Sequence, residues 1–396
     1  MFPTDIVILA GARTPMARYC GAFKDVSALD LGAHAAREAL RRAGTDPGEV
    51  DHVVFGNVMQ TSADAIYGAR HVGLKAGVKT ETPAVTVNRL CGSGIEAIAQ
   101  AAQRLLLDEA KLVLAGGTEN MTQAPHVMRG LRTGLRLGEG KLEDYLWVAL
   151  TDTYCGFSMA ETAENLASEY GITRQASDEF ALRSQQAAED AYKSGRMKDE
   201  IVPVEVKEGR KTKTASEDDH RRPDTTMEIL AALPPAFRKD GIVTAGNASG
   251  IVDGAAAVVV THAKTAKERG WKPMGRIVSW GVAGVEPRIM GIGPVPATQQ
   301  ALQRAGLKLE QMELIEVNEA FAPQYLAVEK ALGLDREKTN VNGGAIALGH
   351  PLGATGTRLV LTLLYELRRR GKRYGLATAC IGGGQGIAMV IESLGH

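Results

Sequence analysis

Two cysteines and a histidine stand in glycine-rich stretches whose spacing could support nucleophilic catalysis. The first, Cys91, follows a β-branched run at residues 84–87 and precedes an apolar helical pattern. Unpaired N–H groups and the positive dipole at a helix start favour the thiolate, which is the attacking form of cysteine. A small, inert cysteine buried in a strand-to-helix turn is the alternative, and this stretch alone does not separate the two.

Three stretches of the second half add proton-transfer chemistry. Asn318 and Glu319 follow an apolar run, His350 lies in a glycine-rich loop before a helical pattern, and Cys380 precedes three glycines. A histidine that takes the proton of one thiol, with a second thiol as acid or base, would form an activated nucleophile. Glycine N–H groups beside Cys380 could form an oxyanion hole. Taken singly, each of these features also has a purely structural explanation.

An internal repeat indicates how these residues meet. Residues 39–44 read ALRRAG and residues 301–306 read ALQRAG, and strand-like runs recur at a similar separation. Cys91 and His350 are separated by nearly the same distance along the chain. We therefore expect two similar α/β halves related by a pseudo-two-fold axis, with a ligand site between them.

Alternating strand and helix patterns predict the elements that position the candidate site. We expect strands at 5–10, 50–56, 111–117 and 275–280, and helices at 28–43, 160–170 and 174–194. The middle region, roughly 122–250, breaks the repeat and is predicted to be an insertion on the first half. Its charge-rich stretch, 207–224, is expected to be solvated surface.

Composition excludes several classes of function. The 396 residues carry 46 Lys and Arg against 46 Asp and Glu, so no excess positive charge favours a nucleic acid partner. The start of the chain lacks a secretory signal pattern, and no apolar run is long enough for a membrane span. The four cysteines are widely spaced without CxxC or HExxH motifs. We expect reduced thiols, a cytoplasmic location and no metal site.

Four motifs together resemble those of the thiolase family over essentially the whole chain, and most resemble the 3-ketoacyl-CoA thiolases of mitochondrial fatty-acid oxidation and bacterial acetyl-CoA acetyltransferases. They read NRLCGSG at 88–94, NEAFA at 318–322, NGGAIALGHP at 342–351 and CIGGGQG at 380–386. The resemblance implies an α/β thiolase fold, with two similar α/β halves forming a five-layered αβαβα structure and an inserted loop domain. The implied segments are an N-terminal half (1–121), a loop domain (122–250), the end of the N-terminal half (251–272) and a C-terminal half (273–396).

The resemblance also implies a role for each candidate catalytic residue. Cys91 would carry the acyl group as a thioester, and His350 would take its proton. Cys380 would handle the proton of the α-carbon of the acetyl-CoA unit. Asn318 would hold a water that, with His350, stabilises the enolate oxygen. The N–H groups of Cys91 and Gly382 would form a second oxyanion hole.

The implied activity is thiolytic cleavage of 3-ketoacyl-CoA to acetyl-CoA and a shortened acyl-CoA, reversible as a Claisen condensation. Coenzyme A would be a substrate, without a tightly bound cofactor. The implied assembly is a homotetramer built as a dimer of dimers, with residues 122–142 as a candidate assembly loop. The substrate and CoA-binding residues carried over by position are Arg222, Ser249, Leu233, Phe237, Ala245, Met159, Met290 and Phe321.

One departure from the family pattern bears on substrate range. Ser158 and Met159 stand where many acetoacetyl-specific members have a His-Met pair, and Ile229 replaces a CoA-contacting serine of some of them. This favours a broader range of chain lengths. The alternatives are a dedicated acetyl-CoA C-acetyltransferase, a ketoacyl-ACP synthase, a catalytically silent acyl-CoA-binding protein, and a redox pair of Cys91 and Cys380.

Overall fold

Two half-sheets joined edge to edge form the frame of the molecule. The structure, a computed structural model, describes residues 5–395. Its main sheet runs in the order β14-β15-β16-β13-β1-β12-β5-β3-β4, and the short strand β2 pairs with β12. The first half supplies β1 (Ile6–Arg13), β2 (Ala17–Arg18), β3 (His52–Gly56), β4 (Ala84–Val87), β5 (Leu112–Glu119) and β12 (Val252–His262). The second half supplies β13 (Gly275–Gly284), β14 (Leu314–Val317), β15 (Tyr374–Ile381) and β16 (Gln385–Ser393).

The same order of elements occurs twice. The helices of the two halves are α1 (Ala28–Ala43), α2 (Gly68–Ala76), α3 (Ser93–Leu106), α8 (Ala263–Arg269), α9 (Pro294–Ala305), α10 (Ala322–Leu332), α11 (Ala345–Leu348) and α12 (Leu352–Arg369). The series β1-α1-β3-α3-β5-β12 corresponds to β13-α9-β14-α12-β15-β16. Parallel pairing joins β3 to β5 in one half and β14 to β15 in the other. Antiparallel pairing of β1 with β13 joins the halves.

The repeated ALRRAG and ALQRAG sequences are repeated helix ends. Gly44 and Gly306 cap α1 and α9 with φ angles of 65° and 67°, in the left-handed region that favours glycine. At the other end of α1, the Ser27 side chain accepts a hydrogen bond from the N–H of Asp30. Because Ser27 and Gly44 mark the two ends of α1, its bounds at residues 28 and 43 could be predicted correctly from the sequence.

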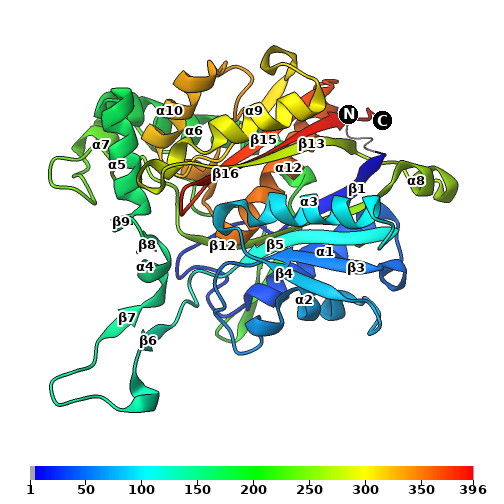
Figure 1. Ribbon diagram of the computed structural model, residues 1–396, viewed down its shortest axis with the longest axis horizontal. Helices are drawn as coiled ribbons and strands as arrows, with labels where there is room; N and C mark the ends of the chain where they lie inside the picture. Colours follow the sequence, from blue (N-terminus) through cyan, green and yellow to red (C-terminus); the bar gives the residue numbers. More distant parts are fainter. Residues whose placement is uncertain (1–4, 396) are drawn as a thin grey trace.

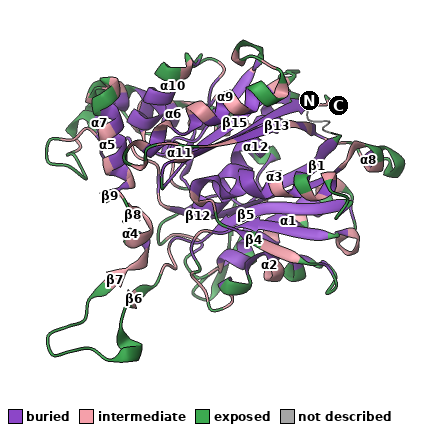
Figure 2. Cartoon of the chain, in the orientation of Figure 1, coloured by how far each residue is buried: buried purple, intermediate pink, exposed green. Residues whose placement is uncertain are grey.

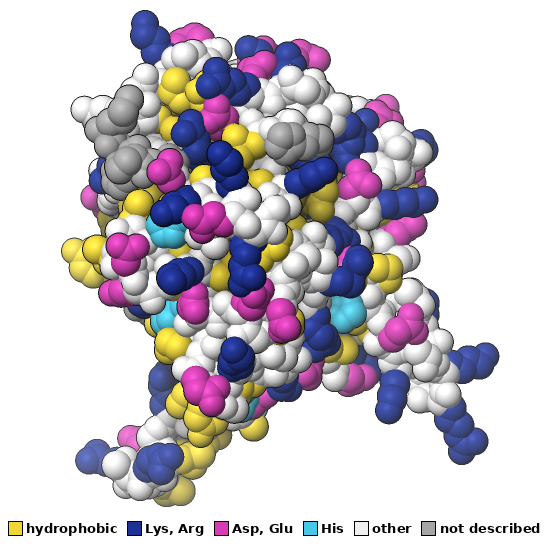
Figure 3. Space-filling model, turned by 90° about the vertical axis from the view of Figure 1, so that its right-hand side faces the viewer, with side chains coloured by type: hydrophobic (Ala, Val, Ile, Leu, Met, Phe, Trp, Pro, Cys, Tyr) yellow, Lys and Arg dark blue, Asp and Glu magenta, His cyan; other side chains and the backbone are white. Residues whose placement is uncertain are grey.

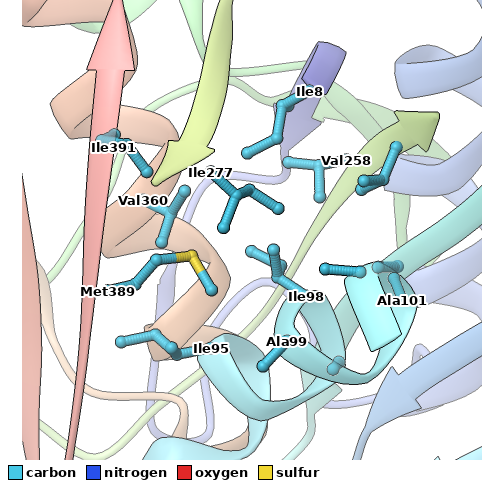
Figure 4. Close-up of a cluster of buried hydrophobic side chains, with 14 of the residues drawn as sticks. Ile8, Ile95, Ile98, Ala99, Ala101, Val258, Ile277, Val360, Met389 and Ile391 are labelled. Carbon is cyan, nitrogen blue, oxygen red and sulfur yellow. The ribbon is translucent and has the colours of Figure 1, made fainter. Parts of the chain in front are cut away.

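Strand alternation distributes the core into layers. In β1, Ile6 and Ile8 point to the central layer, whereas Val7 and Leu9 point to α1 and α2. Figure 1 shows α3 and α12 between the two half-sheets, and Figure 4 shows side chains from both halves meeting there. The outer face of the second half-sheet packs on α9 and α10. The five-layered α/β prediction is confirmed.

The middle region adds helices and a projecting arm. Its elements are β6 (His126–Met128), β7 (Leu142–Asp144), α4 (Tyr145–Ala149), β8 (Thr151–Asp152), β9 (Phe157–Ser158), α5 (Met159–Tyr170), α6 (Arg174–Lys193), β10 (Val204–Glu208), β11 (Lys211–Ala215) and α7 (Met227–Ala232). The hairpin β6-β7 extends away from the body and is exposed along most of its length (Figures 1 and 2). The predicted helices at 160–170 and 174–194 are α5 and α6. The domain boundaries at residues 121, 250 and 272 stay predictions.

The charge-rich stretch 207–224 is only partly the solvated surface that we expected. Its hairpin β10-β11 is mostly exposed, but Asp218 is fully buried and receives two hydrogen bonds from the Arg13 guanidinium. Burial alone would raise the pKa of Asp218, but the charge and hydrogen bonds of Arg13 lower it below its usual value. Arg13 also bonds Glu200 at 2.6 Å. This buried ion-pair cluster ties the inserted region to the end of β1.

Candidate active site

Cys91 lies in a tight turn between β4 and α3. The turn is a 3₁₀ segment, Leu90–Gly92, in which Leu90 has a φ of +45°, a strained value for a branched side chain. Gly92 is required by packing, because a Cβ there would lie 2.5 Å from Ile381 of the second half. The sequence NRLCGSG therefore brings the thiol to the contact between the two halves.

The environment of Cys91 shows that the helix start alone does not make it a thiolate. Burial raises the pKa of the thiol to about 11, although the N–H groups of Gly382 and of Cys91 itself face the sulfur and oppose the rise. The isolated thiol is therefore protonated near pH 7. A nearby proton acceptor is needed for it to act as a nucleophile.

His350 lies immediately before α12, at the position that corresponds to Cys91 before α3. Its Nδ1 is 2.6 Å from the Thr355 hydroxyl, which donates its own proton to the Pro351 carbonyl at 3.0 Å. The hydroxyl can therefore only accept from Nδ1–H, and this leaves the lone pair on Nε2. Asn318 Nδ2 lies 3.3 Å from Nε2 and donates to it. The imidazole is held as the tautomer that accepts a proton at Nε2.

Burial, together with the nearby charge of Arg358, lowers the pKa of His350 to about 3. The imidazole is therefore neutral over the physiological range. Asn318, which follows β14, is fully buried, and its Oδ1 has no hydrogen-bond partner among the described residues. That oxygen is available to a donor that enters the site.

Cys380 is the next-to-last residue of β15 and is fully buried. Burial raises its pKa well above the usual value, and the charge that Cys91 would carry raises it further, which indicates that the thiols are neighbours. Met290, in the 3₁₀ segment Pro287–Ile292, packs against Cys380 with Ala320. Gly382, two residues on, lies against Met159 and Leu90, where a Cβ would lie 3.1 Å from the methionine sulfur.

A pocket of about 120 Å³ opens beside these groups. Five of the residues singled out from the sequence line it, namely Ser249, Phe237, Met159, Phe321 and His350. The other lining residues are Met121, Trp147, Leu150, Ser158, Ala160, Ala248, Gly250, Ile251 and Leu352. Polar groups gather near His350 while the rest of the wall is apolar, as in sites for flexible, mainly apolar ligands.

Four of the proposed CoA-binding residues do not line this pocket. Arg222 is exposed and lines a separate hollow of about 350 Å³ with Gln185 and Thr225. Leu233 is half-buried against the cluster around α6 and α7, and Ala245 is exposed. Met290 is buried behind Cys380 and does not line the pocket.

Sequence reasoning missed Glu119, a fully buried carboxylate at the end of β5. It accepts hydrogen bonds from the N–H groups of Val58, Met59 and Gly353 at 3.1, 3.0 and 2.9 Å. Burial raises its pKa to about 7 against the opposing effect of these N–H groups. Because Gly353 belongs to α12, Glu119 fixes the start of the second half's helix to the loops of the first. Its only sequence signal was a carboxylate at a strand end.

The described residues, 5–395, contain neither a metal-ligating cluster nor a membrane-spanning helix. No group of three or more His, Cys, Asp or Glu side chains in residues 5–395 is arranged to hold a metal ion. None of the helices in that range is long and apolar enough to cross a membrane. Acidic and basic side chains intermingle over the face shown in Figure 3.

Two similar α/β halves, with two buried thiols and a neutral imidazole near the contact between them, define an α/β enzyme. Comparison with known proteins identifies its family. Residues 6–264 match the family described as "Thiolase, N-terminal domain" and residues 271–393 match "Thiolase, C-terminal domain". The chain belongs to the thiolase family.

Individual relatives cover nearly the whole chain. The human mitochondrial 3-ketoacyl-CoA thiolase is 54% identical over 389 residues, covering 98% of each chain. An acetyl-CoA acetyltransferase of Pseudomonas aeruginosa is 49% identical, covering 98% of this chain and 99% of the relative. The crystal structure of the human mitochondrial enzyme in complex with CoA superposes with a TM-score of 0.96 over 98% of each chain.

Proposed function

We propose that this protein catalyses CoA-dependent thiolytic cleavage of 3-ketoacyl-CoA, reversible as a Claisen condensation of acetyl-CoA. The observation that carries the proposal is the fixed tautomer of His350, a buried neutral base with its Nε2 lone pair turned toward Asn318. Two buried thiols share its surroundings, and membership of the thiolase family supports the same chemistry.

The proposed reaction assigns a task to each group. Proton transfer from Cys91 to Nε2 of His350 gives the thiolate, which bonds to the 3-keto carbon of the substrate. The C2–C3 bond then breaks, and its electron pair forms the enolate of acetyl-CoA. Cys380 protonates the enolate carbon, while His350 and a donor held by Asn318 stabilise the enolate oxygen.

The second half of the reaction regenerates the enzyme. The thiol of free CoA gives its proton to the Cys380 thiolate left by the first half and attacks the acyl carbon on Cys91. The bond from that carbon to the Cys91 sulfur then breaks, and the sulfur takes back the proton held by His350. The tetrahedral intermediate carries an oxyanion, for which the N–H groups of Cys91 and Gly382 are suitable donors. These two N–H groups already face the Cys91 sulfur, which supports this role.

We propose acyl-CoA thioesters of several chain lengths as the substrates, with CoA as a substrate and no tightly bound cofactor. The human mitochondrial relative has been crystallised in complex with CoA, which supports this choice of ligand. Ser249, Phe237, Met159 and Phe321 would line the path of the thiol-bearing arm, and Arg222, Leu233, Ala245 and Met290 complete the proposed binding set. An acetyl-CoA acetyltransferase confined to four carbons is the second candidate, favoured by the names of the bacterial relatives.

Assembly and location are part of the same proposal. We propose a homotetramer, because the β6-β7 arm carries exposed apolar side chains at Met128, Leu131, Leu135, Leu137 and Leu142 that a second copy would cover. Light scattering of the protein and of a Leu137→Asp variant tests it.

We also propose a cytoplasmic location, since all four cysteines are unpaired, as in a reducing compartment. Cell fractionation tests it, and recovery in an organelle fraction would contradict it.

The decisive experiment combines turnover with covalent labelling. We expect thiolysis of 3-ketoacyl-CoAs across four to sixteen carbons, and an acetyl group on Cys91 when the protein meets acetyl-CoA without an acceptor. Peptide mass spectrometry locates the adduct. Absence of both turnover and adduct would favour a silent acyl-CoA-binding protein, whereas turnover confined to the four-carbon substrate would favour the dedicated acetyltransferase.

A further inference from the structure

The two thiols of the site face different apolar surroundings. Cys91 packs in a cluster with Met59, Met121, Leu146 and Leu352, bordered by half-buried side chains that include Tyr145, Ala149 and Leu150. Cys380 packs in a separate, smaller cluster with Met290 and Ala320, closed by Met159 and Phe321. The Cys91 cluster is the larger of the two and has more half-buried neighbours, through which it extends toward the surface.

Three walls of the Cys91 cluster are rigidly held. Glu119 accepts the N–H of Met59 at 3.0 Å and that of Gly353, next to Leu352, at 2.9 Å. Asp253 accepts the N–H and the hydroxyl of Thr122, next to Met121, at 3.0 and 2.6 Å. Buried carboxylates with several charge-assisted hydrogen bonds resist displacement. These walls are not expected to move when the site is occupied.

The fourth wall is Leu146, on the single-turn helix α4. Leu146 is 5% exposed and faces the cluster, while its neighbour Trp147 is 54% exposed, lines the pocket and stacks on Phe237 with the ring centroids 6.5 Å apart. Five residues form α4, and it lies where the projecting arm meets the body (Figure 1). Its supports are at its ends: Asp144 caps the N–H of Leu146, and the Leu150 carbonyl accepts the N–H of Met159. A five-residue helix has few hydrogen bonds of its own, so α4 is the wall that can yield.

We infer that Leu146 sets the length of the linear acyl chain that Cys91 carries. The inference rests on the proposed function, in which the variable acyl group is bonded to the Cys91 sulfur while the constant two-carbon unit reacts beside Cys380. A short acyl group needs little room in the Cys91 cluster. A longer alkyl chain extends along Met121 and Leu352 and displaces Leu146 with α4, at a cost that the leucine side chain determines.

The test compares the chain-length profiles of two opposite substitutions. Leu146→Ala should raise the ratio of kcat/KM for the ten-carbon over the four-carbon 3-ketoacyl-CoA about tenfold, since one or a few methylene groups in an apolar pocket discriminate by roughly ten- to two-hundredfold. Leu146→Phe should lower the same ratio. The fraction of Cys91 acylated by decanoyl-CoA relative to acetyl-CoA, from mass spectrometry, should move with it.

Controls separate this inference from general destabilisation and from failure of the proposed function. Leu334→Ala removes a comparably buried leucine from the outer cluster of the second half, and its ratio should stay at the wild-type value. An unchanged ratio in both Leu146 variants, or a shift in the same direction in both, would overturn the inference while leaving the proposed function intact. If the wild-type protein shows no turnover and no adduct at any chain length, the proposed function itself fails.

Discussion

The two halves share a scaffold but divide the chemistry between them. Before the central helix, the first half has Cys91 (before α3) and the second has His350 (before α12). After the corresponding strands, Asn57 follows β3 and Asn318 follows β14. The Asn57 amide donates to the Thr118 carbonyl at 3.0 Å and to Glu119 at 3.2 Å. The Asn318 amide donates to His350 instead. Under the proposed function, equivalent positions thus serve structure in one half and proton transfer in the other.

The ends of the corresponding strands β5 and β15 show the same division. Glu119, at the end of β5, fixes backbone of both halves, whereas Cys380, at the end of β15, is a thiol packed among apolar groups. A duplicated framework gives two helix starts that meet at one place. The proposed nucleophile and its proposed base arise there because the side chains at the two helix starts differ.

The largest expected effect comes from removing the nucleophile of the first half. Cys91→Ser should fold but lose at least about 10⁴-fold in kcat, because a buried hydroxyl ionises far less readily than a thiol, and loss of a nucleophile in a catalytic unit costs on this order. Steady-state thiolysis with circular dichroism as a folding control measures it. Near-normal turnover would show that the division between the halves is wrong.

Removing the Cys380 thiol should separate acylation of Cys91 from proton transfer at the α-carbon. Cys380→Ser should still acquire an acetyl group on Cys91 from acetyl-CoA, because that step does not need the α-carbon proton. Condensation and thiolysis should fall by about 10² to 10⁴-fold, the usual contribution of a positioned acid or base. Quenched-flow labelling and steady-state rates give the two numbers. Equal loss of both would assign Cys380 to the first step as well.

A matched pair of asparagine substitutions tests the comparison most directly. Asn318→Ala should lower kcat about a hundredfold with modest loss of stability, since it removes a donor beside the reacting proton. Asn57→Ala should leave kcat within a few-fold but destabilise the fold by about 1–3 kcal/mol, because Glu119 and Thr118 lose a buried donor. Kinetics and denaturant unfolding of both variants measure the effects, and exchanged phenotypes would contradict the assignment.

The sequence predicted the elements that recur in the two halves and the helix ends that depend on neighbouring residues. Strand alternation, the glycine caps of α1 and α9, and the recurrence of ALRRAG located the layers correctly, because short-range periodicity determines these features. The glycine-rich motifs also pointed to residues that meet around one pocket. The sequence could not predict the protonation of Cys91, since burial in the assembled halves, rather than the helix start, dominates its pKa.

Long-range contacts account for the other differences. Asp218 reads as one acid in a charged surface run, and only its meeting with Arg13, across the fold, explains its burial. Trp147, Leu150 and Leu352 line the pocket without carrying a motif, because their positions depend on how α4 and α12 pack. Thr355 could have been found, since a hydroxyl five residues after His350 and one turn into its helix faces the imidazole.

Removing the hydrogen bond that orients His350 should have a smaller effect on kcat. Thr355→Val removes the acceptor of the His350 Nδ1 proton while keeping the shape of the side chain. Loss of one hydrogen bond worth about 1 kcal/mol should lower kcat roughly five- to tenfold, with KM little changed. Thr355→Ser restores the hydroxyl and should recover most of the rate. Failure of the serine variant to recover activity would assign Thr355 a packing role only.

The smallest expected effect concerns pH and distinguishes the base from ordinary histidines. A general base works while unprotonated, and burial with the nearby Arg358 lowers the pKa of His350 from its ordinary 6.5 to about 3. Protonation therefore begins only at strongly acidic pH, and kcat/KM should not fall through His350 as the pH drops from 8 to 5. Glu119, with a pKa of about 7, and Asp253, whose pKa burial raises to about 6, are buried groups near the site that titrate in this range. Profiles of the wild type, Glu119→Gln and Asp253→Asn distinguish these carboxylates from His350. An acid limb near pH 6.5 that persists in both variants would show that His350 behaves as an exposed imidazole and that the second half does not supply a base that rests neutral.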